Sequence, residues 1–132
     1  MLKTEPTATR PGTVAVVGAS TDRRKFGNKA VRAFLEQGWT VWPVTLSATE
    51  VEGQRAYRSV LDLPAQVDMI TVYVQPDVAR ALLPEFLASG AREVWLNPGA
   101  DDDDVLAEAK RLGLPVIAAC SIVGLGRRPA EF

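Results

Sequence analysis

The sequence predicts an α/β protein with a doubly wound, mainly parallel five-stranded sheet and helices on both faces. Short apolar runs, typical of strands that are buried on both sides, alternate with segments whose apolar residues recur at helical spacing. Glycines stand where the helical segments end. Such alternation is typical of strand–helix–strand units, whose crossovers are right-handed. We expect the strand order 3-2-1-4-5.

The N-terminal half is expected to contribute two strands with a helix between them. Residues 1–12 are polar and hold two prolines, so we interpret them as a flexible lead-in to one domain at 13–132. The expected elements are a strand at 13–17, a helix at 28–37 and a strand at 40–45. Pro43 lacks an amide hydrogen, so the second strand is expected at an edge of the sheet.

The segment at 46–66 is less regular than the rest of the chain. Tyr57 is expected in a short additional strand, and Ser59 is expected to cap a helical turn. Regular alternation then resumes with strands at 67–74, 93–96 and 114–118 and helices at 76–89 and 101–112. Pro84 lies inside the first of these helices and is expected to kink or split it.

The composition argues against several classes of function. The chain has 132 residues, 15 basic and 16 acidic, and a formal charge of -1, which argues against a nucleic-acid partner or a polybasic membrane anchor. It contains no histidine, so a Ser-His-Asp mechanism within the chain is excluded and the commonest metal ligand is missing. No catalytic group and no metal site are predicted.

The single cysteine, Cys120, cannot form an intrachain disulfide, which favours a reducing, cytoplasmic location. No apolar stretch approaches the roughly 20 residues that a membrane helix needs. The polar first twelve residues lack the apolar core of a signal peptide. We therefore expect no membrane association.

The loop after the first strand is the strongest candidate site. Residues 14–27 read VAVVGASTDRRKFG, in which the small Gly18 and Ala19 would let a ligand approach the backbone. Ser20 adds a hydroxyl group, and the following helix would direct free N–H groups at an anion. Three basic side chains suited to phosphate follow, namely Arg23, Arg24 and Lys25. The alternative is a tight turn with solvated basic residues.

This loop is not the NAD fingerprint. That motif needs G-x-G-x-x-G and an acidic residue about 20 positions further on, at the end of the second strand. Here the middle glycine is missing, and the second strand ends without a carboxylate at Val44 and Thr45. Glu50 and Glu52 come later and are expected in a loop. The longer, basic loop suits a more heavily phosphorylated nucleotide.

Several segments in a fixed order resemble a known family. They are VAVVGAS, GWTVWPV, YRSVLDLPAQVD, the strand before Pro76, and VWLNPG, and the resemblance covers about residues 13–120. They resemble the small single-domain CoA-binding proteins, which are similar in fold to the CoA-binding domain of the succinyl-CoA synthetase α subunit. The resemblance implies a Rossmann-like domain that binds coenzyme A non-covalently.

The resemblance also implies contact residues, carried over position by position. The small residues Gly18, Ala19 and Ser20 would meet the diphosphate. Lys25, with Arg23 or Arg24, would meet the phosphates. Two further residues of this loop are included as contacts, Phe26, which would cover the ligand, and Gly27.

The remaining implied contacts come from the ends of later strands. Val44 and Thr45 would flank the adenosine, and Gln75 and Pro76 would lie beside the nucleotide. Two more residues, Asn97 and Gly99, would lie near the pantetheine arm.

Cys120 is included in this site because it follows the last strand, where it either forms a mixed disulfide with coenzyme A or packs as a small apolar residue. The chain departs from the family by having Gln75 where an arginine is usual and Ala118-Ala119 before Cys120. Two later arginines, Arg127 and Arg128, offer compensation for the lost charge.

Two other patterns have a structural and a functional interpretation. The run Asp101–Asp104 is interpreted as a helix start capped by Asp101 rather than as a metal site. Three tryptophans are candidates either for the core or for stacking on adenine, with core packing favoured for Trp42 and Trp95 and partial exposure considered for Trp39.

We therefore predict a stand-alone CoA-binding protein that holds coenzyme A or an acyl-CoA at the carboxyl edge of the sheet, without catalysis of its own. A homo-oligomer and a partner enzyme are both left open. The alternatives are an NAD(P)-binding oxidoreductase or redox sensor, and a regulatory module without a ligand.

Overall fold

A computed structural model describes residues 11–132, and the lead-in predicted at 1–12 lies almost entirely outside this part of the chain. A parallel sheet with the order β2-β1-β5-β6-β7 forms its centre. The strands of this sheet are β1 (Thr13–Val17), β2 (Thr40–Val44), β5 (Met69–Val72), β6 (Glu93–Leu96) and β7 (Val116–Ile117). A separate antiparallel hairpin is formed by β3 (Glu50–Val51) and β4 (Gln54–Arg55).

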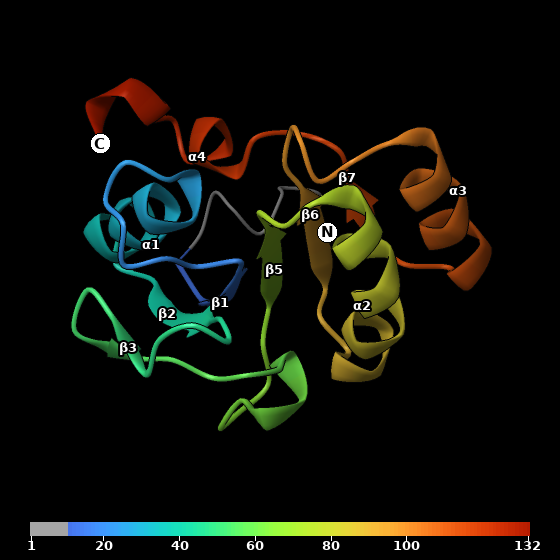
Figure 1. Cartoon of the computed structure of the whole chain (residues 1–132), viewed down its shortest axis with the longest axis horizontal. Helices are drawn as coiled ribbons and strands as arrows, with labels where there is room; N and C mark the ends of the chain where they lie inside the picture. The colour runs from blue at the N-terminus through green and yellow to red at the C-terminus, as the bar shows by residue number, and fades with distance from the viewer. Residues whose placement is uncertain (1–10) are drawn as a thin grey trace, which may run out of the picture.

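Helices cover both faces of the sheet, as predicted. The helical elements are α1 (Phe26–Glu36), η2 (Val60–Asp62), α2 (Pro76–Ser89), α3 (Asp103–Leu112), α4 (Ser121–Gly124) and η3 (Pro129–Glu131). Figure 1 shows α1 and α4 on one side of the sheet and α2 and α3 on the other. Within residues 11–132, no helix is long and apolar enough to cross a bilayer.

Successive side chains of β1 pack alternately into two hydrophobic cores. Val14 and Val16 pack with Phe34 of α1 on one face, whereas Ala15 and Val17 pack on the face that α2 and α3 cover. Because successive side chains of a strand point to opposite faces, a strand between two helical layers is expected to carry apolar side chains on both faces. The uninterrupted apolar run of β1 is thus explained by its central place.

The predicted fold class is confirmed, but the order of the strands differs from the prediction. Counted along the chain, the five sheet strands lie in the order 2-1-3-4-5, because β5 pairs with β1 instead of lying outside β2. All four residues of β5 are buried, and such a strand is shielded better in the centre of a sheet than at its edge. The place outside β2 holds a single parallel bridge between Val44 and Tyr57.

Several element boundaries are refined by the structure. Asp102, not Asp101, is the N-cap of α3, and its side chain accepts a hydrogen bond from the Val105 N–H at 2.8 Å. Asp101 instead accepts from the Gly99 N–H at 3.2 Å, in the preceding turn. Ser59 caps the helical turn η2 as predicted, and its hydroxyl accepts from the Leu61 N–H.

Of the two outcomes predicted for Pro84, a kink or a split of the second helix, the split does not occur. The helix α2 runs continuously from Pro76 to Ser89, with Pro84 inside it. Leu83 and Phe86 on either side are almost completely buried against the sheet. Packing of this face compensates for the hydrogen bond that proline removes.

The tryptophans belong to the cores rather than to a ligand site. Trp39, for which partial exposure was expected, is 4% exposed and makes an edge-to-face contact with Phe34 at a centroid distance of 5.1 Å. Trp95 is buried as well, and Trp42 packs partly buried against the core under α2 and α3. None of the three borders the cavities described below.

Candidate functional site

Two glycines bring the end of β1, the end of β5 and the start of α1 into close contact. Gly18 has a φ of +90°, and a Cβ atom on it would lie 2.8 Å from the Tyr73 carbonyl oxygen. A Cβ atom on Gly27 would overlap the Gly18 carbonyl oxygen. The Gly18 N–H donates to the Val44 carbonyl at 3.0 Å. Only glycine fits at both positions, and their contact puts the N-terminus of α1 beside the carboxyl edge of the sheet.

The loop between these glycines is folded by its own polar groups. The Ser20 hydroxyl accepts from the Asp22 N–H at 3.0 Å, and the Asp22 carbonyl accepts from the Lys25 N–H at 3.1 Å. Arg24 folds back onto Asp22, with its Nε and Nη2 atoms 3.1 and 3.0 Å from the two carboxylate oxygens. These side-chain hydrogen bonds from Arg24 lower the pKa of Asp22 to about 2.

A buried amide joins the loop to α1 and to the β3–β4 hairpin. Asn28 is fully buried, and its Nδ2 donates at 2.9 Å both to the Ser20 carbonyl and to Oε2 of Glu52. Its Oδ1 accepts from Arg32 Nε at 2.7 Å. Arg32 also donates to the Arg23 carbonyl at 2.8 Å. The loop therefore has several fixed points instead of being an open turn.

A cavity of about 440 Å³, which we call the loop cavity, opens where these elements meet. Most of the predicted site residues line it, namely Gly18, Ala19, Ser20, Lys25, Phe26, Gly27, Thr45, Gln75 and Gly99. The prediction did not include Ser47, Tyr73, Val74, Pro98 and Ala100, which also line it. Four of these residues directly follow a strand or adjoin a predicted residue, so strand ends were the signal for them, whereas Ser47 lies three positions beyond β2.

The lining of the loop cavity is suited to an anion. Lys25 contributes an ammonium group, Ser20 a hydroxyl group, and the first turn of α1 its free N–H groups. No aspartate or glutamate is among the lining residues. Phe26, which is 52% exposed, places an apolar ring at the rim.

Three predicted contacts from the strand ends lie elsewhere. Val44 is buried, and its carbonyl holds Gly18. Pro76 borders a separate hollow between the first turns of α2 and α3. Cys120 is half-buried and packs against the core on the α1 side.

The two arginines of the loop also lie outside the lining. Arg23 faces Glu52, with 3.6 Å between Arg23 Nε and Glu52 Oε2, and Arg24 is occupied by Asp22. Both side chains are largely exposed, so these ion pairs are weak. Of the three basic residues predicted to meet phosphate, the structure brings only Lys25 to the loop cavity.

Asn97 is part of a buried hydrogen-bond network and does not line the loop cavity. Its Nδ2 donates to Thr71 Oγ1 at 2.7 Å and to the Val72 carbonyl at 3.0 Å, and its Oδ1 accepts from the Ser121 N–H at 2.8 Å. The Ser121 hydroxyl shares hydrogen bonds with Thr71 and with Tyr73. Burial raises the pKa of Tyr73 to about 12, although its hydrogen bond to Ser121 opposes the shift. The amide of Asn97 therefore joins β5, β6 and α4.

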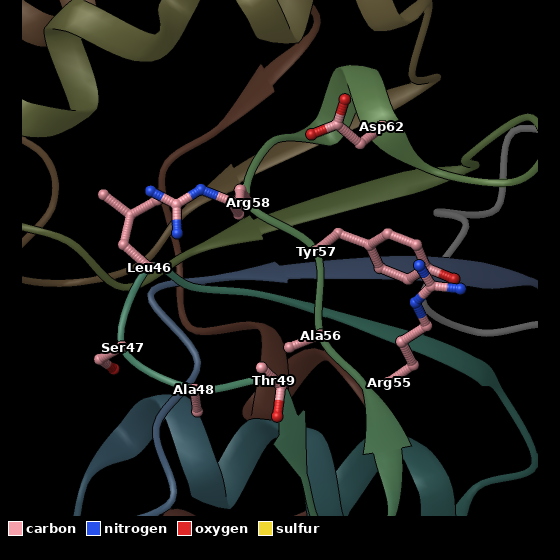
Figure 2. A pocket seen from close by; sticks show the side chains of 9 residues that line it. All are labelled: Leu46, Ser47, Ala48, Thr49, Arg55, Ala56, Tyr57, Arg58 and Asp62. Atoms are coloured by element: carbon pink, nitrogen blue, oxygen red, sulfur yellow. The ribbon is translucent and has the colours of Figure 1, made fainter.

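A second cavity, of about 680 Å³, lies beside the loop cavity, and Ser47 lines both. We call it the hairpin cavity, because the segment that contains β4 forms one wall (Figure 2). Arg55 stacks on Tyr57, with 5.4 Å from its guanidinium carbon to the ring centre. Arg58 extends on the other side, toward Leu46 (Figure 2). The YRS segment of the sequence thus supplies two of the lining residues.

The carboxylate run at Asp101–Asp104 is the start of a helix. Asp102 caps α3, and Asp103 and Asp104 occupy its first turn, where they complement the helix dipole. Across residues 11–132, no cluster of three or more carboxylate or thiol side chains is arranged to hold a metal ion.

Comparisons with known proteins agree with this geometry. A family model described as "CoA binding domain" matches residues 12–125. The α subunit of the ADP-forming acetate–CoA ligase II of Pyrococcus furiosus is 35% identical over 85 residues, which is 64% of this chain. The chain spans only 19% of the length of that subunit.

Solved structures of similar size share the fold. A protein from Thermus thermophilus superposes with a TM-score of 0.80 at 34% identity, over 88% of this chain and 89% of its own. A hypothetical protein from Pyrococcus horikoshii superposes with a TM-score of 0.82 at 29% identity, over 89% of this chain and 83% of its own.

Proposed function

The chain belongs to the CoA-binding domain family, and we propose that it holds coenzyme A or an acyl-CoA non-covalently in the loop cavity. The observation that carries the proposal is the lining of this cavity. It combines a helix N-terminus, an ammonium group and glycine backbone at the carboxyl edge of a parallel sheet, without a carboxylate. A diphosphate is the chemical group that such a lining favours.

The diphosphate would lie against Gly18, Ala19 and the first turn of α1. Free N–H groups there donate to phosphate oxygens, and Lys25 neutralises charge as a flexible cation. Ser20 offers a further hydroxyl donor from the same loop. We keep Arg23 and Arg24 as secondary contacts that would have to leave Glu52 and Asp22 to reach a ligand.

The adenosine end of coenzyme A, which carries a 3′-phosphate, would extend past Thr45 and Ser47 into the hairpin cavity. Arg58 and Arg55 line this cavity and provide positive charge for the additional phosphate. The pantetheine arm would leave the loop cavity on the opposite side, near Gln75 and Gly99. The two cavities together offer space for a ligand longer than one nucleotide.

We propose recognition without chemistry. The chain contains no histidine, and the loop cavity offers one lysine and no carboxylate for proton transfer. Its ligase relative is more than three times as long, so the catalytic groups of such a ligase would come from other domains or from a partner enzyme. We expect the chain to act in the reducing cytoplasm, in keeping with its single thiol, Cys120.

An NAD(P)-dependent oxidoreductase is the less favoured alternative. NAD recognition needs a carboxylate for the ribose hydroxyls at the end of the second strand. Here β2 ends at Val44, and Glu52 is engaged by Asn28 outside the loop cavity.

Calorimetry with coenzyme A, dephospho-CoA, NADH and NADPH tests the proposal. We expect coenzyme A to bind most tightly, dephospho-CoA more weakly because it lacks the 3′-phosphate, and NADH weakly or not at all. Tight binding of NADH together with no binding of coenzyme A would overturn the proposal. Failure of all four ligands to bind would favour a regulatory module without a ligand.

A further inference from the structure

The turn of the β3–β4 hairpin carries an unusual residue. Glu50 pairs with Arg55 and Val51 with Gln54, so the turn consists of Glu52 and Gly53. Glu52 has a φ of +50° and Gly53 a φ of +78°, as in hairpin turns that favour asparagine or glycine at the first position. Among residues 11–132, Glu52 is the only non-glycine residue with positive φ. Turn chemistry alone therefore does not explain a glutamate here.

The carboxylate of Glu52 holds the loop between β1 and α1 at two points. Its Oε2 accepts from Asn28 Nδ2 at 2.9 Å, and the same amide donates to the Ser20 carbonyl. The carboxylate also faces Arg23 Nε at 3.6 Å. Because Asn28 is fully buried, loss of its partner would leave a polar group unsatisfied and weaken its hold on Ser20.

The hairpin can serve as an anchor because it is fixed independently of this contact. Val51 is completely buried and packs in the core on the α1 side. The Ala56 N–H after β4 donates to the Thr49 carbonyl before β3 at 2.9 Å and closes the base of the hairpin. A change at Glu52 therefore acts on the loop without removing the support of the hairpin.

We propose that Glu52 is a positioning residue for ligand binding. Through Asn28 and Arg23 it fixes the loop in the conformation in which Ser20 and Lys25 converge on the loop cavity. Glu52 itself lines neither the loop cavity nor the hairpin cavity. The inference rests on the proposed function insofar as the ligand is coenzyme A. The contacts of Glu52 with Asn28 and Arg23, which we call the tether, are a property of the free protein.

The substitution Glu52→Asn separates positioning from folding. Asparagine suits the turn better but is shorter by one methylene group, so it no longer reaches Asn28. We expect the melting temperature to change little, because relief of the strained turn offsets the lost hydrogen bond to Asn28, while amide hydrogen exchange in residues 18–27 becomes faster. Affinity for coenzyme A should fall roughly tenfold, as for the loss of one hydrogen bond to a charged group. Glu52→Gln keeps the oxygen acceptor and should restore both exchange and affinity to nearly wild-type values.

Glu50→Gln is the matched control, because Glu50 lies exposed on the same hairpin, and it should leave exchange and affinity unchanged. If amide hydrogen exchange in residues 18–27 of the Glu52→Asn variant is as slow as in the wild-type protein, the inference is overturned. A loss of stability across the whole domain would overturn it as well. If Glu52→Asn does not fold, Glu52→Gly provides the same comparison, because glycine adopts positive φ freely. If the wild-type protein does not bind coenzyme A, the proposed function fails, and exchange in the free protein still decides the tether.

Discussion

Gly27 lies directly against the Gly18 carbonyl group, with no space between them for a side chain. In an exposed helix, replacing glycine with alanine stabilises a protein by up to about 1 kcal/mol. For Gly27→Ala we expect the opposite sign, a loss of roughly 1–3 kcal/mol, because the new methyl group must push α1 away from the end of β1. Urea unfolding of the two proteins measures this difference.

The matched comparison is Gly38→Ala. Gly38, unlike Gly27, has positive φ, and a Cβ atom on it would have nothing within 4 Å. Its substitution should cost only the backbone strain, about 1–2 kcal/mol, and should leave ligand binding unchanged. Gly27→Ala should in addition weaken the binding of coenzyme A, and a Gly27→Ala protein as stable as the wild type would contradict the packing described.

Lys25 and Arg24 are neighbours in sequence with different surroundings, so they form a natural pair of variants. Lys25 lines the loop cavity, whereas Arg24 is bound to Asp22 outside it. We expect Lys25→Ala to weaken coenzyme A binding about tenfold or more, the effect of losing a charge-assisted hydrogen bond. Arg24→Ala should change the affinity less than about twofold. Equal losses in calorimetry would show that the loop acts only through its total charge.

Arg58 provides a test of the hairpin cavity. If it meets the 3′-phosphate, Arg58→Ala should weaken the binding of coenzyme A about tenfold and leave dephospho-CoA nearly unaffected. The preference for coenzyme A over its dephospho form would then largely vanish. Lys110→Ala, an exposed substitution on α3, controls for the loss of one positive charge from the whole protein. A parallel loss for both ligands would place Arg58 away from the additional phosphate.

The buried phenol of Tyr73 predicts a change of stability at high pH. Burial raises its pKa from 10.0 to about 12, so between these values the unfolded chain ionises while the folded protein does not. The stability that this group contributes is fully present below pH 10 and is lost as the pH rises toward 12, by roughly 2–3 kcal/mol. Urea unfolding at pH 8 to 11 measures the decline.

Tyr73→Phe isolates the contribution of the phenol. At pH 8 the variant should be about 1 kcal/mol less stable, because the hydrogen bond to Ser121 is lost. It should also show a smaller decline above pH 10, because it lacks the buried phenol whose ionisation favours the unfolded chain. Identical slopes in the two proteins would mean that the phenol ionises as easily in the folded state as in the unfolded one.

The fold class was predictable because it depends on local periodicity, and the strand order was not. The bounds of α2 and β6 follow from apolar spacing and from Gly90, which adopts the left-handed conformation at the end of α2. The place of β5 depends on which neighbour buries an apolar strand best, and β1 and β2 are both apolar enough to pair with it. That competition is decided by tertiary packing rather than by any local signal.

The candidate site was only partly predictable, because side-chain direction is not encoded in a motif. Lys25 and Arg24 are equivalent in sequence, yet only one of them faces the loop cavity. Asn97 follows a strand and was predicted to meet the ligand, but Thr71 and Ser121 engage its amide. The burial of Asn28 could have been predicted from the sequence. This small polar residue stands three positions before Val31, on the apolar face of the helix.

The bridge between Val44 and Tyr57 protects the β2 edge of the sheet against pairing with a strand from another molecule. The Thr45 N–H donates to the Tyr57 carbonyl, and the Tyr57 N–H donates to the Pro43 carbonyl, both at 2.9 Å. Pro43 has no amide hydrogen to offer, and β7 at the opposite edge is only two residues long. Neither edge is a good template for a strand from another molecule, so we expect crowded copies of this domain to resist aggregation by strand addition.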